Sequence, residues 1–114
     1  MYSSIFLKTE NELNKVLRLQ KKTKDNIGIL FLSLWDPQSQ TILKKIRTNK
    51  SFRKKEGSKP LYIVDSFTMP HAFVIHNVTK CPTLISLSRD KYVKEDYLPR
   101  IYSELGCEPV TFSI

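Results

Sequence analysis

Two cysteines and two histidines are the residues of this chain best suited to redox chemistry or metal binding. Cys81 and Cys107 provide neither a disulfide framework nor a metal-ligand spacing. His71, His76 and Cys81 recur at intervals of five, which on a helix sends successive side chains to different faces, so the spacing argues against zinc. We therefore predict no metal site and no cofactor, and expect these residues to occupy ordinary core or surface positions.

Basic residues between positions 44 and 59 form a second group that could bind a ligand or a partner. The segment holds eight basic residues against one acidic residue, which gives +7 of the formal net charge of +8. The eight are Lys44, Lys45, Arg47, Lys50, Arg53, Lys54, Lys55 and Lys59. Such a cluster attracts phosphates or an acidic partner, but it can also simply solvate a helix end and the following loop. Both interpretations remain open.

The elements that must position these residues alternate between strand and helix patterns. Short runs of aliphatic, β-branched and aromatic residues predict strands over 2–7, 27–34, 61–64, 83–87 and 91–93. Apolar residues at helical spacing predict helices over 10–22, from 37 into the basic segment as far as Gly57, over 70–76 and over 98–105. This order predicts an α/β fold with a mixed sheet and helices on both faces.

Polar residues at the expected helix starts fit capping patterns. Thr9 and Glu12 form a capping box, in which each side chain accepts a hydrogen bond from the other residue's amide. Asp36 is a strong N-cap before Pro37, and we expect it to accept from the amide of residue 38 or 39. Asp96 is the expected N-cap of the last helix.

Length and composition indicate one intracellular domain. The chain has 114 residues, 40% of them hydrophobic, which suits one compact core over residues 1–106 with a tail at 107–114. The longest apolar run is far too short to span a membrane, and the N-terminus lacks the features of a signal peptide. We therefore expect an intracellular protein.

Three motifs, together with the order of elements, resemble the thioredoxin fold. Trp35 before a helix that opens at Pro37 resembles the W-C-x-x-C junction, and "VDSFTMP" at 64–70 resembles V-D-x-x-x-x-P. "VTKCPTLISL" at 78–87 resembles V-x-x-x-P-T-L-x-x-F, in which the proline is cis. The resemblance covers residues 2–106 and implies a sheet of 4–5 strands, about four helices and a cis peptide bond before Pro82.

The sequence departs from this pattern where the redox chemistry takes place. The two redox cysteines correspond to Asp36 and Ser39, which can form no disulfide, so dithiol exchange at this site is excluded. The buried Asp that many members place five residues before the Trp corresponds to Leu30. Cys81 remains as a redox candidate beside Asp36. The carboxylate of Asp36 would raise the pKa of the Cys81 thiol, whereas the helix N-terminus would lower it. The alternative to a reactive Cys81 is an inert, half-buried thiol.

A second resemblance supplies a precedent for a role without dithiol chemistry. "WDPQSQTILKKI" at 35–46 and "YIVD" at 62–65 are similar to segments of the thioredoxin-like protein of the spliceosomal tri-snRNP. That family uses the fold as a scaffold in a ribonucleoprotein. The cysteine of its W-D-P-x-C segment is Ser39 here, and the region after Pro82 follows thioredoxin better.

The resemblance and the basic cluster together lead to three candidate functions. The favoured one is a redox-inactive protein-interaction module, whose groove between the Trp loop and the cis-proline loop binds extended polypeptide within a larger assembly. Its residues would be Trp35, Asp36, Pro37, Ser39, Lys80, Cys81 and Pro82. The alternatives are a nucleic-acid or ribonucleoprotein subunit that binds phosphates through residues 44–59, and a thiol-redox protein that uses Cys81 alone. We expect no membrane contact and no small-molecule substrate.

Overall fold

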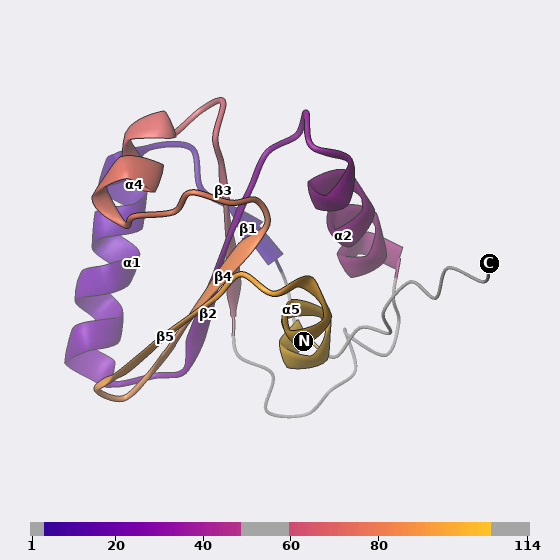
Figure 1. Ribbon diagram of the computed structural model, residues 1–114. Helices are drawn as coiled ribbons and strands as arrows, with labels where there is room; N and C mark the ends of the chain where they lie inside the picture. Colours follow the sequence, from indigo (N-terminus) through magenta and orange to yellow (C-terminus); the bar gives the residue numbers. More distant parts are fainter. Residues whose placement is uncertain (1–3, 49–59, 106–114) are drawn as a thin grey trace.

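The computed structural model describes residues 4–48 and 60–105, which form a mixed five-stranded sheet in the order β1-β3-β2-β4-β5 (Figure 1). The strands are β1 (Ser4–Phe6), β2 (Ile27–Leu32), β3 (Leu61–Asp65), β4 (Thr83–Ser88) and β5 (Lys91–Glu95). The helices in these ranges are α1 (Glu10–Thr23), α2 (Pro37–Thr48), α4 (Pro70–Ile75) and α5 (Leu98–Leu105). The predicted α/β class and element order are confirmed.

Strand β2 lies at the centre of the sheet because all six of its residues are apolar or glycine and all are buried. It pairs in parallel with β3 and antiparallel with β4. The prediction ran this strand to residue 34, which is two residues too long. Leu34 is exposed, and its amide bonds to the side chain of Asp65 instead of to a neighbouring strand.

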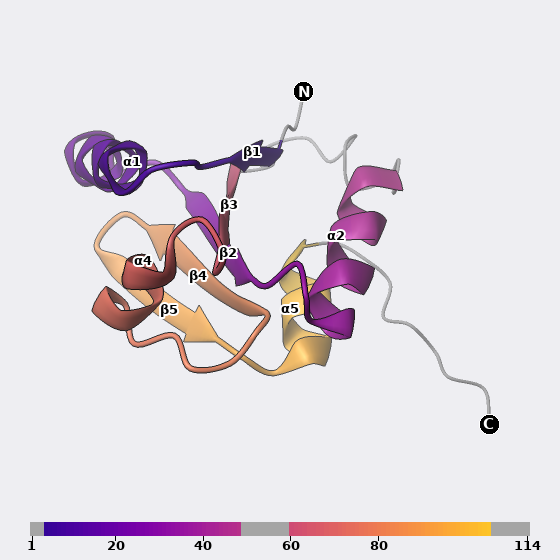
Figure 2. The same ribbon diagram turned by 90° about the horizontal axis from the view of Figure 1, so that it is seen from above.

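Helices cover both faces of the sheet, with α1 and α4 on one side and α2 and α5 on the other (Figure 2). Successive side chains of the central strands point to opposite faces of the sheet and pack into two separate cores. Leu30 and Leu84 pack with Ile101 of α5 on one face, whereas Ile29 and Phe31 belong to the core beneath α1 and α4. Leu30 is therefore a fully buried core residue.

The start of α1 follows the predicted capping box with one difference. The Thr9 hydroxyl accepts a hydrogen bond from the Glu12 amide at 3.2 Å, as predicted. The Glu12 carboxylate, however, accepts from the amide of Lys8 at 3.2 Å, one residue earlier than the predicted amide of Thr9. Two backbone donors at the helix entrance are satisfied in this way.

The start of α5 differs from the prediction. The helix begins at Leu98, and the carbonyl of Tyr97 accepts the first helical bond, from Ile101, so Asp96 precedes the cap position. The side chain of Glu95 accepts from the Tyr97 amide at 3.0 Å, immediately before the first helical residue. Gly57, the predicted domain boundary at residue 106 and the tail at 107–114 lie outside the described residues.

Candidate protein-interaction site

The loop between β2 and α2 presents Trp35 on a firmly held backbone. The amide of Leu34 donates to Oδ1 of Asp65 at 3.2 Å, and the side-chain amide of Gln40 donates to the Leu34 carbonyl at 2.6 Å. The residue before the tryptophan is therefore fixed from both sides. Trp35 itself is 79% exposed, which agrees with the surface position predicted for it.

The first turn of α2 uses the two residues that correspond to the redox cysteines. A carboxylate oxygen of Asp36 accepts from the Ser39 amide at 2.8 Å, so the predicted N-cap is confirmed. The Ser39 hydroxyl accepts from the amide of Ser33 at 3.1 Å. Ser39 is only 1% exposed, so it cannot contact a partner as predicted; it supports the loop from inside. Pro37 is exposed beside it.

The second loop enters β4 through a cis peptide bond between Cys81 and Pro82, as the resemblance implied. The Thr83 hydroxyl donates to the carbonyl of Lys80 at 2.8 Å and closes this loop. Pro82 is buried, Cys81 is half-buried and Lys80 is exposed. Next to the cis bond, Lys80 and Cys81 are therefore accessible, and Thr79 before them is exposed as well.

Electrostatics couple Cys81 to the tryptophan loop. Burial raises the pKa of the Cys81 thiol above its ordinary value, and the charges of Asp36 and then Asp65 raise it further. The pKa of the thiol is therefore shifted in the direction expected from a neighbouring carboxylate. A thiol with a raised pKa stays protonated at neutral pH, and it is then a poor nucleophile.

Asp65 is a site residue that the sequence analysis did not single out. It is 3% exposed, and among the described residues its second carboxylate oxygen has no hydrogen-bond partner. The sequence feature that could have identified Asp65 is its position as a charged residue at the end of the apolar strand β3. Its contact with Leu34, 31 positions away in the sequence, was not visible.

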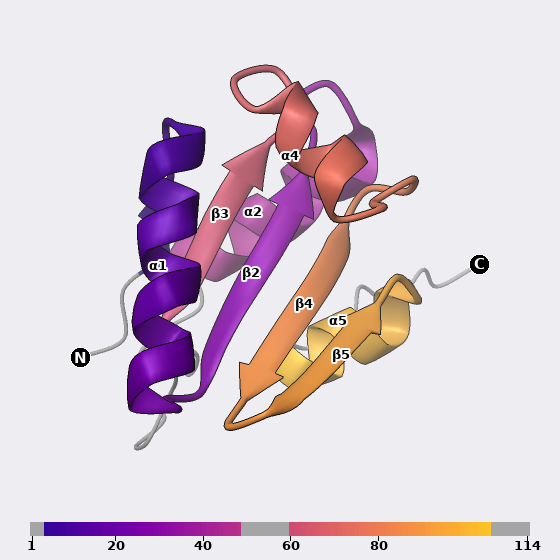
Figure 3. The same ribbon diagram turned by 90° about the vertical axis from the view of Figure 1, so that its left-hand side faces the viewer.

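Exposed apolar side chains gather at the same end of the sheet. Phe67 lies two residues beyond the end of β3 and is 73% exposed, and Val74 and Ile75 of α4 are also exposed. Figure 3 shows the β2–α2 loop, the β3–α4 loop and α4 together at the end where β2 and β3 finish. Several exposed apolar residues therefore belong to elements at one end of the sheet, which makes that end a candidate contact surface.

Only part of the basic cluster lies within the described residues. Lys44, Lys45 and Arg47 belong to α2. The ammonium group of Lys45 lies 5.5 Å from the ring centre of Tyr102, and the guanidinium of Arg47 lies 5.5 Å from that of Phe6. These two cations therefore help to pack α2 against its neighbours. The remaining members, Lys50, Arg53, Lys54, Lys55 and Lys59, lie outside the described residues.

Neither a metal centre nor a membrane span is found in the parts of the chain that the structure describes. No group of three His, Cys, Asp or Glu side chains is placed to hold a metal ion in these ranges. His71 is exposed, and the ring of His76 lies 5.7 Å from that of Phe31. No helix in residues 4–48 and 60–105 is long and apolar enough to cross a membrane. Cys107 is outside these ranges.

Several solved structures with a similar arrangement are thioredoxins. Thioredoxin O2 of Arabidopsis thaliana superposes with a TM-score of 0.69 at 20% identity, covering 91% of this chain and 92% of its own. A thioredoxin of Schistosoma mansoni gives 0.72 at 17% identity, covering 91% and 96%. That of Fasciola hepatica gives 0.70 at 19% identity, covering 90% and 96%. No protein-family model and no curated protein sequence matches the chain.

These similarities establish the fold as thioredoxin-like. They extend over about nine tenths of the chain, so the resemblance inferred from the three motifs is confirmed at the level of fold. Sequence identity of 20% or less carries no further statement about activity. The similarity of the "WDPQS" segment to the spliceosomal protein stays a prediction.

Proposed function

We propose that this chain is a thioredoxin-fold interaction module that binds an extended segment of another protein across the Trp35 loop and the Cys81–Pro82 loop. The observation that carries the proposal is the 79% exposure of Trp35 on a loop whose backbone is fixed by Asp65 and Gln40. A large, exposed aromatic side chain on a rigid support is typical of interface hot spots. Little conformational entropy is lost when a partner binds such a preorganised surface.

The chemistry of the two loops favours binding over dithiol exchange. Asp36 is engaged as the N-cap of α2, and the hydroxyl of Ser39 is buried and bonded to the Ser33 amide. Neither side chain can take part in disulfide exchange. The raised pKa of Cys81 works against a thiolate at neutral pH.

The partner segment would be extended and mainly apolar, with an acidic or polar residue near Lys80. Trp35 and Phe67 offer apolar surface at this end of the sheet, while Lys80 supplies the positive charge of the second loop. An extended segment can place side chains alternately against such features while its backbone bonds to the exposed loop.

The test is affinity purification from the native source with three forms of the chain. Trp35→Ala should lose the specific partner, whereas Tyr97→Ala, which removes another exposed aromatic after β5, should retain it. Equal recovery of the same partner by the wild type and Trp35→Ala would show that the tryptophan loop is not the binding surface.

A reductase assay addresses the single-cysteine alternative. Insulin reduction with dithiothreitol should proceed at the uncatalysed rate in the presence of the wild-type chain. Turnover above that rate, abolished by Cys81→Ser, would overturn the non-redox part of the proposal.

The charge of residues 44–59 favours phosphate binding as a second candidate function. Positive charge alone gives sequence-independent binding that weakens steeply with salt. An electrophoretic mobility shift with RNA across a salt series tests it, and no shift even at low salt would remove this candidate.

A further inference from the structure

Strand β5 forms an open edge of the sheet. It pairs with β4 on one side only, and Figure 3 shows it as the outermost strand, with no labelled element beyond it. Its first four residues are all exposed, and among them Tyr92 and Val93 are 53% and 52% exposed. An open edge with exposed apolar side chains is a template for pairing with another strand.

The backbone of β5 presents hydrogen-bonding groups at this edge. A two-residue turn joins Ser88 to Lys91, so the β4–β5 ladder starts there with a hydrogen-bonded pair and alternates along the strand. The amides and carbonyls of Tyr92 and Lys94 therefore point away from β4. Within residues 4–48 and 60–105, no backbone group outside the ladder bonds to them. An added strand would bond to these groups.

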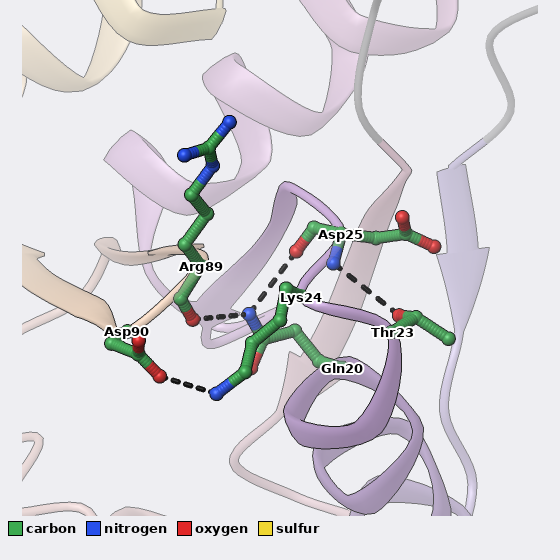
Figure 4. Close-up of polar contacts among 6 residues, drawn as sticks. All are labelled: Gln20, Thr23, Lys24, Asp25, Arg89 and Asp90. Atoms are coloured by element: carbon green, nitrogen blue, oxygen red, sulfur yellow. Dashed lines mark hydrogen bonds and ion pairs between the residues drawn. The ribbon is translucent and has the colours of Figure 1, made fainter.

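Side-chain bonds hold this edge in place at two points. The side-chain amide of Gln20 in α1 donates to the carbonyl of Arg89 in the hairpin turn at 3.0 Å (Figure 4). Farther along the strand, the ammonium group of Lys94 donates to the carbonyls of His76 and Asn77 at 3.1 Å and 2.7 Å. The edge is thus preorganised, and little conformational entropy is lost when a second strand pairs with it.

The register of the β4–β5 ladder assigns the side chains of β5 to the two faces of the sheet. Lys94 lies opposite Ile85, a residue of the core beneath α1 and α4, so Tyr92 and Lys94 share that face. The other face, toward α2 and α5, receives the three remaining side chains of the strand: Lys91, Val93 and Glu95. That face of β5 therefore carries a cation, an apolar residue and an anion in this order.

We propose that β5 pairs antiparallel with β5 of a second copy of this chain, around a two-fold axis at Val93. Val93 then faces its own copy, and on either side of it Lys91 faces Glu95 of the second copy. On the opposite face, Tyr92 lies against the aliphatic stem of Lys94 of the second copy. The outward amides and carbonyls of Tyr92 and Lys94 bond to one another across the axis, so this register uses every outward-pointing group of the strand.

Charge favours this register over its alternatives. Within the described residues Lys91 has no carboxylate partner, and Oε2 of Glu95 lies 3.8 Å from Arg100, too far for a hydrogen bond, so it can still accept one. Opposite charges that face each other across strands are stabilising, and like charges are destabilising. A parallel in-register pair would place each lysine of β5 beside its own copy. An antiparallel register centred on Lys94 would set that lysine against itself.

Sedimentation velocity of the full chain, from low micromolar to millimolar concentration, tests the proposal. A strand edge of five residues buries less surface than an obligate dimer interface, so we expect a monomer–dimer equilibrium in the upper micromolar range. A two-fold contact closes on itself, so association should stop at the dimer. A chain that stays monomeric throughout, or that forms larger species without a dimer, overturns the proposal.

The variants Lys91→Glu and Glu95→Lys, alone and mixed, test the register. Each variant alone sets like charges against each other twice, once on either side of the axis, and should weaken the dimer about tenfold. An equal mixture brings opposite charges together again and should form a heterodimer with about the affinity of the wild type. Glu95→Lys also removes the acceptor of the Tyr97 amide, but a damaged fold cannot restore association in the mixture. A mixture as weak as either variant alone would refute the register.

The variant Val93→Lys tests the position of the axis. It sets two ammonium groups against each other in a non-hydrogen-bonded pair, where facing side chains lie closest, and should abolish the dimer. Because Val93 is exposed, the melting temperature should change little. Ile5→Lys is the matched control, since Ile5 is an exposed aliphatic residue on β1, the opposite edge strand, and this variant should dimerise as the wild type does. A normal dimer in Val93→Lys, or an equal loss in Ile5→Lys, contradicts the assignment to β5.

Discussion

Replacing Asp36 by Asn and by Ala should separate two roles of this side chain. Its carboxylate accepts the Ser39 amide at the start of α2, and its negative charge raises the pKa of Cys81. Asparagine caps a helix about as well as aspartate but carries no charge, whereas alanine removes both properties. We therefore expect the two variants to differ in stability and to resemble each other in the reactivity of Cys81.

The size of the stability effect follows from the cap and the helix dipole. Loss of the cap and the charge in Asp36→Ala should lower the free energy of unfolding by about 1–2 kcal/mol. Loss of the charge alone in Asp36→Asn should lower it by about 0.5 kcal/mol. With an unfolding entropy of about 2.1 cal/mol/K per residue, a loss of about 1.5 kcal/mol lowers the melting temperature by about 6 °C.

Both effects are measured on a Cys107→Ser background, so that Cys81 is the one cysteine left in the chain. Thermal unfolding followed by circular dichroism gives the stability, and iodoacetamide alkylation at pH 8 gives the reactivity of the thiol. Both variants should react faster than the parent, because the charge of Asp36 no longer opposes formation of the thiolate. Equal melting temperatures in Ala and Asn would refute the cap, and unchanged alkylation in both would refute the electrostatic coupling.

Three further predictions concern pH and two long-range contacts. Since the folded chain raises the pKa of Cys81, the associated stability is present below the unfolded-state pKa and is lost as the pH rises through the folded-state pKa. Urea midpoints should therefore fall less at alkaline pH in Cys81→Ser than in the wild type, and parallel declines would contradict this. Burial, and then the charge of Lys94, lowers the pKa of His76, so Lys94→Met should raise that pKa in an NMR titration; an unchanged pKa would rule out the influence of Lys94. Gln20→Leu leaves two backbone carbonyls, one of them that of Arg89, without a donor and should cost about 1–3 kcal/mol in urea denaturation; an unchanged midpoint would show that these bonds contribute nothing.

Short-range features of this fold could be read from the sequence. The caps at Thr9 and Asp36 depend on residues three positions away, and both were predicted with the correct acceptor. Element ends set by distant residues were not predictable. Strand β2 ends at Leu32, and beyond it the amide of Leu34 donates to the carboxylate of Asp65. No pattern within the strand predicts that contact.

The same distinction applies to the candidate site. The exposed tryptophan, the cis peptide bond and the influence of Asp36 on Cys81 followed from three short motifs and the resemblance they carry. The burial of Ser39 did not, because a short polar residue near a helix start is as common on the surface as beneath a loop. The bond from the side-chain amide of Gln20 to the carbonyl of Arg89 joins residues 69 positions apart, which only the folded chain brings together.

The exposure of Trp35 also determines what the intrinsic fluorescence of this protein reports. Trp35 is the only tryptophan in the chain, and it lies in water rather than in either core. Its emission should therefore be that of a solvated indole in the native state and should shift little when the cores melt. A partner that covers the loop would move the emission to shorter wavelength, so the chain carries a built-in optical probe of occupancy at its candidate binding surface.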